Sequence, residues 1–275
     1  MLNKKQKEQF LEEGYVVVED LIATEVFDPL IGEFEEEIEA KAQEQYAVGK
    51  LRALYPDAPF DRRLALLCAA SDDYEELWEL GTGKDHKTAG MFAVWTHPSL
   101  VDIVEQFVGP EILAHPQFNS RAKLPRQERT VVPWHQDGGL LSREVDNTMM
   151  VNFWIPLMDA TMETGALQVM PGSHKWAVLP HERLGYYNGV RDAHLPAHEV
   201  VDCPVPYGGG LLLQQRTMHR SVPNTSERVR WSLDLRYCHA DAPTGRAQVP
   251  GFVVRSEREP GRVAQSYLDW VKLFE

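Results

Sequence analysis

The sequence has few cysteines and no long hydrophobic run. Its three cysteines, Cys68, Cys203 and Cys238, are far apart, which favours buried free thiols over a disulfide framework or a CxxC metal site. No stretch approaches the roughly 20 apolar residues of a membrane span. The opening residues MLNKKQKEQF also have no apolar core of signal-peptide length. We therefore expect a cytoplasmic protein with no membrane partner.

Basic residues are also scarce. Lysine and arginine number 28 against 41 aspartates and glutamates, which gives a formal net charge of -13. Because such a chain repels polyanions, we expect no nucleic-acid partner. At 275 residues and 43% hydrophobic content, the chain is long enough for one large domain with a sizeable core. The composition gives no indication of the oligomeric state.

We expect a single domain over residues 1–275, with a helical first third to about residue 110. A short helix should end at Gly14, before a β-branched strand over Tyr15–Val18. Further helices are expected over Asp72–Leu80 and Pro98–Val108. Between this strand and residue 72, a longer helix is indicated by apolar residues at helical spacing: Leu30, Phe34, Ile38 and Ala42.

From about residue 111 to 240 the pattern changes to short β-like segments, and residues 241–275 form a C-terminal extension. Five candidate strands are spaced as in a sandwich or a double-sheet barrel: ILAHPQFNSRAK, TMMVNFWIPL, GALQVMPGS, GGLLLQQRTMHRS and RVRWSLDLRY. The stretch from Leu179 to about Val201 looks too irregular for a strand pair. It is a candidate lid or substrate-facing insertion.

The segment VVPWHQDGG contains a histidine and an aspartate two residues apart. In a strand, His135 and Asp137 would project to the same face and could present a nitrogen and an oxygen to one point. These are two of the three ligands in the 2-His-1-carboxylate arrangement that holds Fe(II) and leaves open coordination positions. An HxD pair alone is weak evidence for such a site.

A second segment, QQRTMHRSVPNTSERVRWSLDLRY, strengthens this interpretation. Alternation places Thr217, His219 and Ser221 on one face of a strand, and the turn PNTSE returns the chain as another strand. One face of the returning strand is polar, with Arg230, Ser232, Asp234 and Arg236. The opposite face is apolar, with Trp231, Leu233, Leu235 and Tyr237. A polar interior is typical of a barrel built around a polar ligand.

These features together resemble the Fe(II)/2-oxoglutarate-dependent oxygenases, and among them the phytanoyl-CoA dioxygenase-like family. The resemblance rests on the HxD pair of His135 and Asp137, on His219, and on Arg230 eleven residues later. The segments EQFLEEGYVVVEDLI and ETGALQVMPGSHK support it, and it runs from about Lys5 to Tyr237. The implied fold is mainly β, with a double-stranded β-helix (jelly-roll) core and N-terminal helices packed on one sheet.

The resemblance also implies roles for individual residues. His135, Asp137 and His219 would be the catalytic iron ligands, and Arg230 would grip the distal carboxylate of 2-oxoglutarate. Ser221 would add a hydroxyl to that carboxylate, and the co-substrate pocket would be lined further by Trp154 and Asn152. The implied reaction uses O₂ to hydroxylate an unactivated C–H bond of a small-molecule metabolite, with release of succinate and CO₂. Related halogenases lack the aspartate ligand, so the presence of Asp137 favours hydroxylation.

Several alternatives stay open at this point. The strand HPQFNSRAK has one polar face, formed by Gln117, Asn119, Arg121 and Lys123. This face could contact 2-oxoglutarate or an anionic substrate, or it could belong to a solvated edge strand. Arg236 could likewise face the substrate or form an ion pair with Asp234. Other functions are a zinc hydrolase that uses the same triad, or a catalytically silent jelly-roll binding protein. The acidic chain favours a small metabolite without coenzyme A as the substrate.

Overall fold

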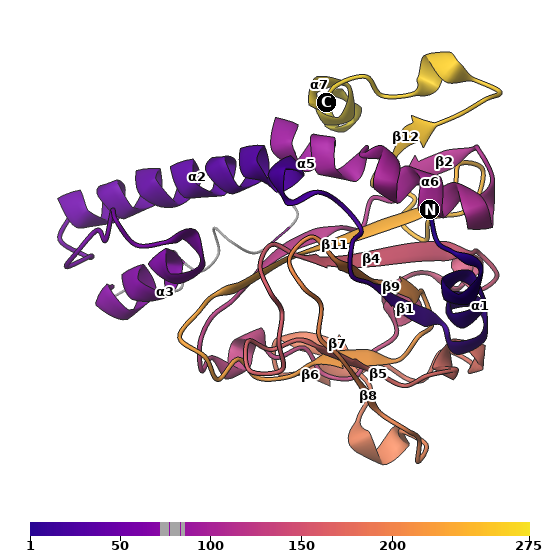
Figure 1. Cartoon of the computed structure of the whole chain (residues 1–275), viewed down its shortest axis with the longest axis horizontal. Coiled ribbons are helices and arrows are strands. Elements are labelled where there is room, and N and C mark those ends of the chain that lie inside the picture. Colours follow the sequence, from indigo (N-terminus) through magenta and orange to yellow (C-terminus); the bar gives the residue numbers. More distant parts are fainter. Residues whose placement is uncertain (72–76, 78–82, 84–85) are drawn as a thin grey trace.

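Two antiparallel sheets form the core of the molecule (Figure 1). The computed structural model describes residues 1–71, 77, 83 and 86–275. The larger sheet has the strand order β1-β9-β4-β11-β2-β12, and β3 also pairs with β11. Its strands are β1 (Tyr15–Val18), β2 (Ile112–Ala114), β3 (Asn119–Lys123), β4 (Met150–Pro156), β9 (Gly210–Gln214), β11 (Arg230–His239) and β12 (Phe252–Arg255). The smaller sheet has the order β10-β5-β8, with β5 (Leu167–Val169), β8 (Val201–Cys203) and β10 (His219–Ser221).

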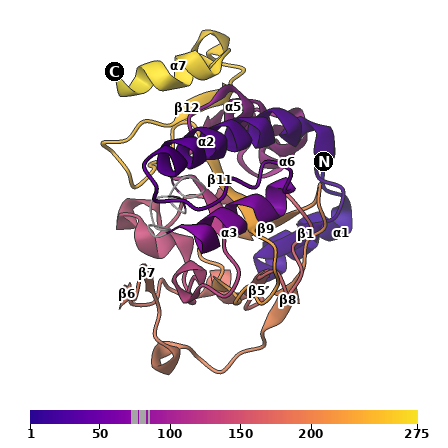
Figure 2. The same ribbon diagram turned by 90° about the vertical axis from the view of Figure 1, so that its left-hand side faces the viewer.

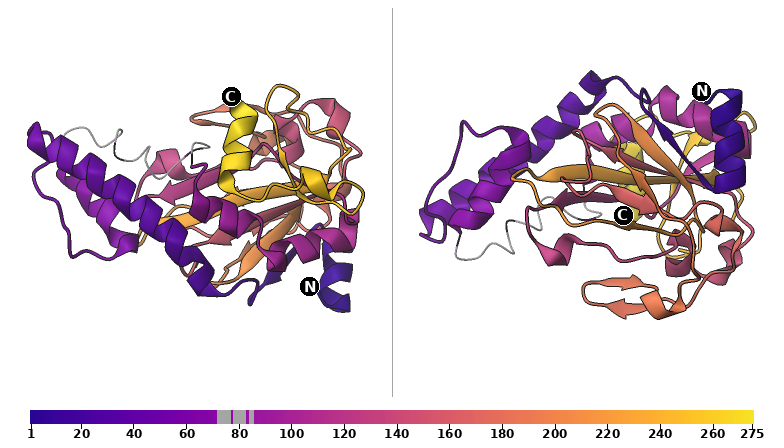
Figure 3. Two further views of the ribbon diagram at one scale, coloured as in Figure 1. Left: turned by 90° about the horizontal axis from the view of Figure 1, so that it is seen from above. Right: turned by 60° about the horizontal axis from the view of Figure 1, so that its bottom comes forward.

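Helices cover the outer face of the larger sheet, and this confirms the predicted jelly-roll core with N-terminal helices on one sheet (Figures 1 and 2). The α-helices are α1 (Lys4–Glu13), α2 (Asp28–Ala47), α3 (Phe60–Ala70), α5 (Ala89–Trp95), α6 (Pro98–Val108) and α7 (Tyr267–Val271). Seen from above, α7 lies on the same side of the sheet as α2 (Figure 3, left). The short 3-10 turns are η1 (Thr24–Phe27), η2 (Glu128–Thr130), η3 (Asp137–Leu140), η4 (Arg143–Val145), η5 (Ser173–Lys175), η6 (Asp192–His194), η7 (Pro260–Arg262) and η8 (Lys272–Phe274).

The helix boundaries follow the local sequence signals. Helix α1 begins with a capping box at Asn3 and ends at Gly14, which has a φ of 83° and leads directly into β1. Helix α6 ends at Gly109, as the sequence predicts. The helix expected over Asp72–Leu80 lies outside the described residues, apart from residue 77. None of the helices that the structure describes has the length and apolar character needed to cross a membrane.

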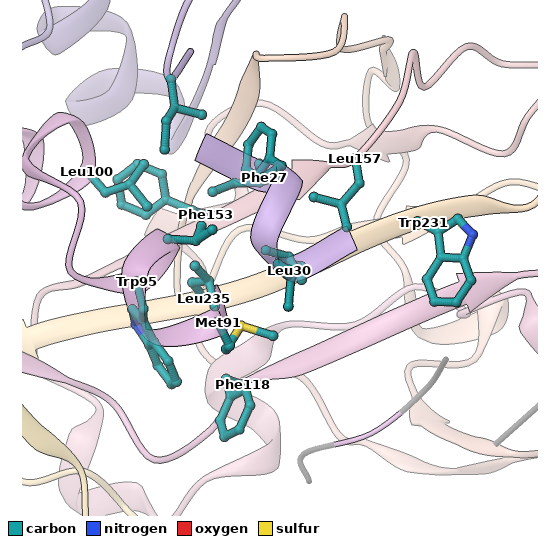
Figure 4. Packing of buried hydrophobic residues seen from close by; sticks show 14 of the residues in the cluster. Phe27, Leu30, Met91, Trp95, Leu100, Phe118, Phe153, Leu157, Trp231 and Leu235 are labelled. Carbon is teal, nitrogen blue, oxygen red and sulfur yellow. The ribbon is translucent and has the colours of Figure 1, made fainter. Parts of the chain in front are cut away.

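Strand β11 separates an apolar layer from a polar one. Its predicted apolar row is buried against the helices: Trp231, Leu233, Leu235 and Tyr237. Figure 4 shows this layer, in which Leu235 lies among residues from α2 and α5 such as Leu30 and Trp95. The aromatic ring of Trp231 stacks on Phe60 at 4.7 Å between ring centroids. Since this layer takes the apolar face, the polar face of β11 is directed toward the smaller sheet.

The strand register brings the polar residues of β11 beside those of its neighbours. On one side, Arg230 pairs with Lys123 and Asp234 pairs with Asn119, both from β3. On its other side β11 pairs with β4, and there Arg236 is opposite Asn152. Side chains directly opposite each other in adjacent strands are in contact distance, so the three strands present one continuous polar surface. The expected division of the chain near residues 110 and 240 stays a prediction, and β1 from the first third is a strand of the larger sheet.

The stretch from 179 to 201 differs from the expectation. We predicted that it is too irregular for a strand pair, but β6 (Glu182–Leu184) and β7 (Tyr187–Gly189) form an antiparallel hairpin. Gly185 adopts a φ of 62° in its tight turn, a conformation that glycine allows at little cost. The hairpin lies on the side of the smaller sheet, away from α2 (Figure 1). Three-residue strands give too short an alternation to be recognised in a sequence.

Candidate active site

Two histidines face each other at the end of the smaller sheet. His135 and His219 exchange backbone hydrogen bonds of 3.0 Å in both directions, and their ring centroids are 4.1 Å apart. The Nδ1 atom of His135 lies 2.9 Å from the carbonyl oxygen of Pro133, and that of His219 lies 2.9 Å from the carbonyl oxygen of Thr217. These carbonyls require a proton on each Nδ1, so each Nε2 keeps its lone pair for a metal.

Asp137 completes a group of three ligand atoms. One ligand atom each from His135, Asp137 and His219 lie within 4.8 Å of one another, and all three residues are buried. The expectation that the HxD pair lies in a strand is wrong, because His135 forms only an isolated bridge and Asp137 begins the turn η3. The side chains converge nonetheless, because Gln136 between them is extended, so that His135 and Asp137 project to the same side. The donor set of two imidazoles and one carboxylate fits Fe(II).

Asp137 is held by two side chains of the larger sheet. Arg236 donates a hydrogen bond from Nη2 to Oδ1 at 2.5 Å, and Asn152 donates one from Nδ2 to Oδ2 at 2.7 Å. Burial alone would raise the pKa of Asp137, but Arg236 and the two histidines hold it below its usual value. Burial, together with His219, lowers the pKa of His135 to about 3. At neutral pH the site therefore offers an ionised carboxylate and a neutral imidazole, as metal binding requires.

Arg236 therefore has a different partner from the one that its spacing suggested. We considered an ion pair with Asp234, two residues away on the same face of β11. Instead Asp234 accepts a hydrogen bond from Nε of Arg121 at 2.7 Å. Arg121 comes from the neighbouring strand β3, where it is opposite Ser232 and lies diagonally across from Asp234.

A cavity of about 470 Å³ opens beside the three ligand atoms. All but one of the other predicted site residues line it: Gln117, Asn119, Arg121, Asn152, Trp154, Ser221, Arg230 and Arg236. This favours the pocket interpretation of the strand HPQFNSRAK over a solvated edge. The exception is Lys123, which lies behind Ser221. The individual roles of these residues in binding stay predictions.

Arg230 is a buried cation in this cavity. Its guanidinium lies over the ring of Trp154, 5.0 Å from the centroid, and Nη1 donates to the hydroxyl of Ser232. No carboxylate of the described residues forms an ion pair with it, and its buried Nε has no hydrogen-bond partner there. Burial lowers the pKa of Arg230 to about 10, so it is charged at neutral pH. A buried unpaired guanidinium fits a site for an anionic ligand.

Ser221 is oriented toward the same cavity by its own hydrogen bonds. Its Oγ accepts a hydrogen bond from Nζ of Lys123 and one from the backbone N–H of Val132, both at 2.9 Å. Nζ of Lys123 also donates to the carbonyl of Thr130 at 2.6 Å. Because both lone pairs of Oγ are used, the hydroxyl proton is left to be donated to a ligand. Lys123 thus supports Ser221 and does not itself line the cavity.

Sequence reasoning missed the residues that hold the HxD turn in place. The Oε1 atom of Gln136 accepts from the backbone N–H of Leu179 at 2.8 Å, and its Nε2 donates to the carbonyl of Arg216 at 2.9 Å. His181 accepts a hydrogen bond from the backbone N–H of Gln136 at 3.0 Å, and its ring lies against Gly139. The glycine pair after Asp137 was the one available signal, since it indicates a close approach of another group.

The comparison with protein families decides the affiliation of the chain. The family model described as phytanoyl-CoA dioxygenase (PhyH) matches residues 10–232. The chain belongs to the phytanoyl-CoA dioxygenase family. The matched region contains the HxD pair, the distal histidine and Arg230.

Two curated proteins are similar to this chain in sequence. A 1-deoxypentalenic acid 11-beta-hydroxylase of Streptomyces arenae is 28% identical over 167 residues, which cover 55% of this chain and 58% of that protein. A probable alpha-ketoglutarate-dependent hypophosphite dioxygenase of Stutzerimonas stutzeri is 30% identical over 151 residues, with 52% and 51% covered. The matches thus span little more than half of these relatives.

The solved structures share the fold. The non-heme monooxygenase ThoJ in complex with nickel has a TM-score of 0.61 at 18% identity, covering 97% of this chain and 92% of that one. The epimerase SnoN in complex with Fe3+, alpha ketoglutarate and nogalamycin RO has a TM-score of 0.56 at 18% identity, covering 89% and 87%. At such low identity, these likenesses establish the architecture.

Proposed function

We propose that this protein is a non-haem oxygenase that depends on Fe(II) and 2-oxoglutarate and hydroxylates an unactivated C–H bond of a small molecule. The observation that carries the proposal is one cavity in which three convergent ligands lie beside a buried arginine, Arg230, that has no carboxylate partner among the described residues. Bound Fe(II) and 2-oxoglutarate would supply the oxidising chemistry with O₂, and 2-oxoglutarate would leave as succinate and CO₂.

Each protein group has a definite task in this proposal. His135, Asp137 and His219 hold the metal, and Arg230 with Ser221 holds the distal carboxylate of 2-oxoglutarate, for which a guanidinium fork is well suited. Trp154 fixes the plane of the Arg230 guanidinium from one side. The remaining task is to orient one C–H bond of the substrate and to exclude bulk water.

The substrate is proposed to be a small molecule without coenzyme A. A cavity of about 470 Å³ is in the usual range for a metabolite site. The names of the two curated relatives refer to a deoxypentalenic acid and to hypophosphite, both small. Cys203 and Cys238 are free thiols, which is consistent with a reducing compartment, and we propose the cytoplasm.

Two other functions are less well supported. A zinc hydrolase could use the same triad to activate water, but it would have no use for the buried Arg230 and the oriented hydroxyl of Ser221. A silent binding protein would not need three convergent ligand atoms. The presence of Asp137 also favours hydroxylation over halogenation.

An anaerobic titration tests the proposal directly. Fe(II) and then 2-oxoglutarate are added to metal-free protein, and the weak visible charge-transfer band of the chelate is recorded. The band should form in the native protein and be lost in His219→Ala, which lacks a ligand. Exposed His194→Ala, in the turn η6, is the matched control and should keep the band. Bound metal without a band in the native protein would overturn the proposal and favour the hydrolase.

A further inference from the structure

The cavity carries a surplus of positive charge. Its lining contains four arginines and two aspartates: Arg121, Arg230, Arg236, Arg246, Asp137 and Asp234. The whole chain has a net charge of -13, so this surplus is a local feature and not a consequence of composition. Fe(II) and the dianion of 2-oxoglutarate would add equal and opposite charges, so the surplus persists in the loaded site.

Two of the four arginines pair with the aspartates, and the proposed function assigns a third to 2-oxoglutarate. Arg236 pairs with Asp137, and Arg121 pairs with Asp234 at 2.7 Å, so both aspartates are used. Arg230 is assigned to 2-oxoglutarate by the proposed function. Arg246 remains: among the described residues, its side chain makes one hydrogen bond, from Nη2 to the carbonyl of Leu140 at 3.3 Å. Within the described chain, its buried Nε has no hydrogen-bond partner and no carboxylate forms an ion pair with it.

The loop that carries Arg246 is held firmly on both sides. Nε2 of the buried His115 donates to the carbonyl of Thr244 at 2.8 Å, while its Nδ1 accepts from the backbone N–H of Gln117 at 3.1 Å. Gly245 has a φ of 67° and packs closely against the segment that contains Leu141, so that an added Cβ would be 3.0 Å from the side chain of Leu141. Arg246 is thus placed in advance beside Leu140, three residues after Asp137.

We infer that Arg246 binds an oxyanion group of the substrate, so that the substrate class is a small organic acid. This inference rests on the proposed function. Arg246 is half-buried in the cavity lining and has no carboxylate partner among the described residues, and a carboxylate or phosphonate of a ligand matches its fork. Apolar residues supply a wall for the rest of the molecule: Leu140, Leu141, Leu167 and Leu213.

Matched pairs of acids and amides test this recognition. Octanoate is compared with octanamide, and cyclohexanecarboxylate with cyclohexanecarboxamide, by anaerobic calorimetric titration into protein loaded with Fe(II) and 2-oxoglutarate. The native protein should bind each acid at least about tenfold more tightly than its amide, as a charge-assisted hydrogen bond provides. Arg246→Gln should bring the ratio close to one, and Arg246→Lys should keep part of the preference. A purely structural role of Arg246 would weaken acid and amide alike and leave the ratio unchanged.

The control is Arg143→Gln, which removes the same charge from an exposed position of the nearby turn η4 and should keep the native ratio. Binding of 2-oxoglutarate is measured first in the same cell and reports on the proposed function separately. This inference alone is overturned if 2-oxoglutarate binds normally but the preference for acids over amides does not depend on Arg246. It is also overturned if 2-oxoglutarate binds normally and none of the four probes binds. Absence of 2-oxoglutarate binding overturns the proposed function as well.

Discussion

Arg236 donates a hydrogen bond to Asp137 at 2.5 Å, and both side chains are buried beside the candidate metal site. The same guanidinium donates from Nη1 to the carbonyl of Gln117 at 3.0 Å, which fixes its plane. Asn152 holds the other oxygen of Asp137. The carboxylate is therefore oriented before any metal arrives, and β4 and β11 determine its direction.

Arg236→Leu should lower metal affinity by about 10- to 100-fold, because the carboxylate loses the partner that orients it and keeps it ionised. The dissociation constant for Fe(II) is measured by anaerobic competition with a chromophoric chelator. Arg121→Leu is the matched control, since it removes another cavity arginine that is paired with Asp234 and not with a ligand. Equal affinity of Arg236→Leu and the native protein would contradict the positioning role.

Arg230→Ala should raise the concentration of 2-oxoglutarate needed for half-saturation by about 100-fold, while metal affinity stays near the native value. The physical reason is the loss of a buried, charge-assisted hydrogen-bond fork. The half-saturating concentration is read from the anaerobic charge-transfer band. Arg228→Ala removes a neighbouring arginine that pairs with Asp61 outside the cavity, and it should behave as native. If Arg230→Ala has no effect, the anchor must be another arginine of the cavity.

Local periodicity accounts for what the sequence predicts well. The alternation in β11 indicates its buried apolar row and its polar inner face, because a strand gives each residue one of two faces. The end of α1 at Gly14 and the start of β1 are likewise local signals. The three convergent ligands follow from spacing together with the family resemblance.

Contacts between distant segments account for what the sequence does not predict. Asp234 pairs with Arg121 because β3 lies beside β11 in that register, which no local pattern indicates. For the same reason Arg236 is free to hold Asp137. The role of Gln136 depends on a segment some forty residues later in the chain, where it bonds to Leu179. Such partners are fixed by the tertiary fold alone.

Lys123→Met should make the stability of the metal-free protein less dependent on pH. Burial, together with Arg230, lowers the pKa of Lys123 to about 6 in the folded state, whereas an unfolded lysine titrates near 10.4. Between these values the unfolded state binds more protons, so the native free energy of unfolding rises with pH by up to about 1.4 kcal/mol per unit. Below about pH 6 both states are protonated, and the native protein carries the full cost of the buried charge.

Urea unfolding of the native protein and of Lys123→Met between pH 6 and about pH 9 measures this difference in slope. The variant should lack the rise that Lys123 contributes, so the two curves of stability against pH converge or cross. Lys175→Met, at an exposed lysine paired with Glu12, should give a curve parallel to the native one. A parallel curve for Lys123→Met would show that the buried lysine keeps an ordinary pKa.

Gly139→Ala should destabilise the protein by about 1–3 kcal/mol, because the added methyl group would overlap the ring of His181. A Cβ at Gly139 would lie 2.1 Å from Cε1 of that ring, and the ring cannot easily move since it bonds to the backbone of Gln136 and of Leu179. Gly138→Ala is the neighbouring control, with its closest contact at 3.5 Å. In the double variant Gly139→Ala/His181→Ala the overlap is gone, so its loss of stability in urea should be smaller than the sum of the two single losses. Additive losses would mean that the ring of His181 does not occupy the space beside Gly139.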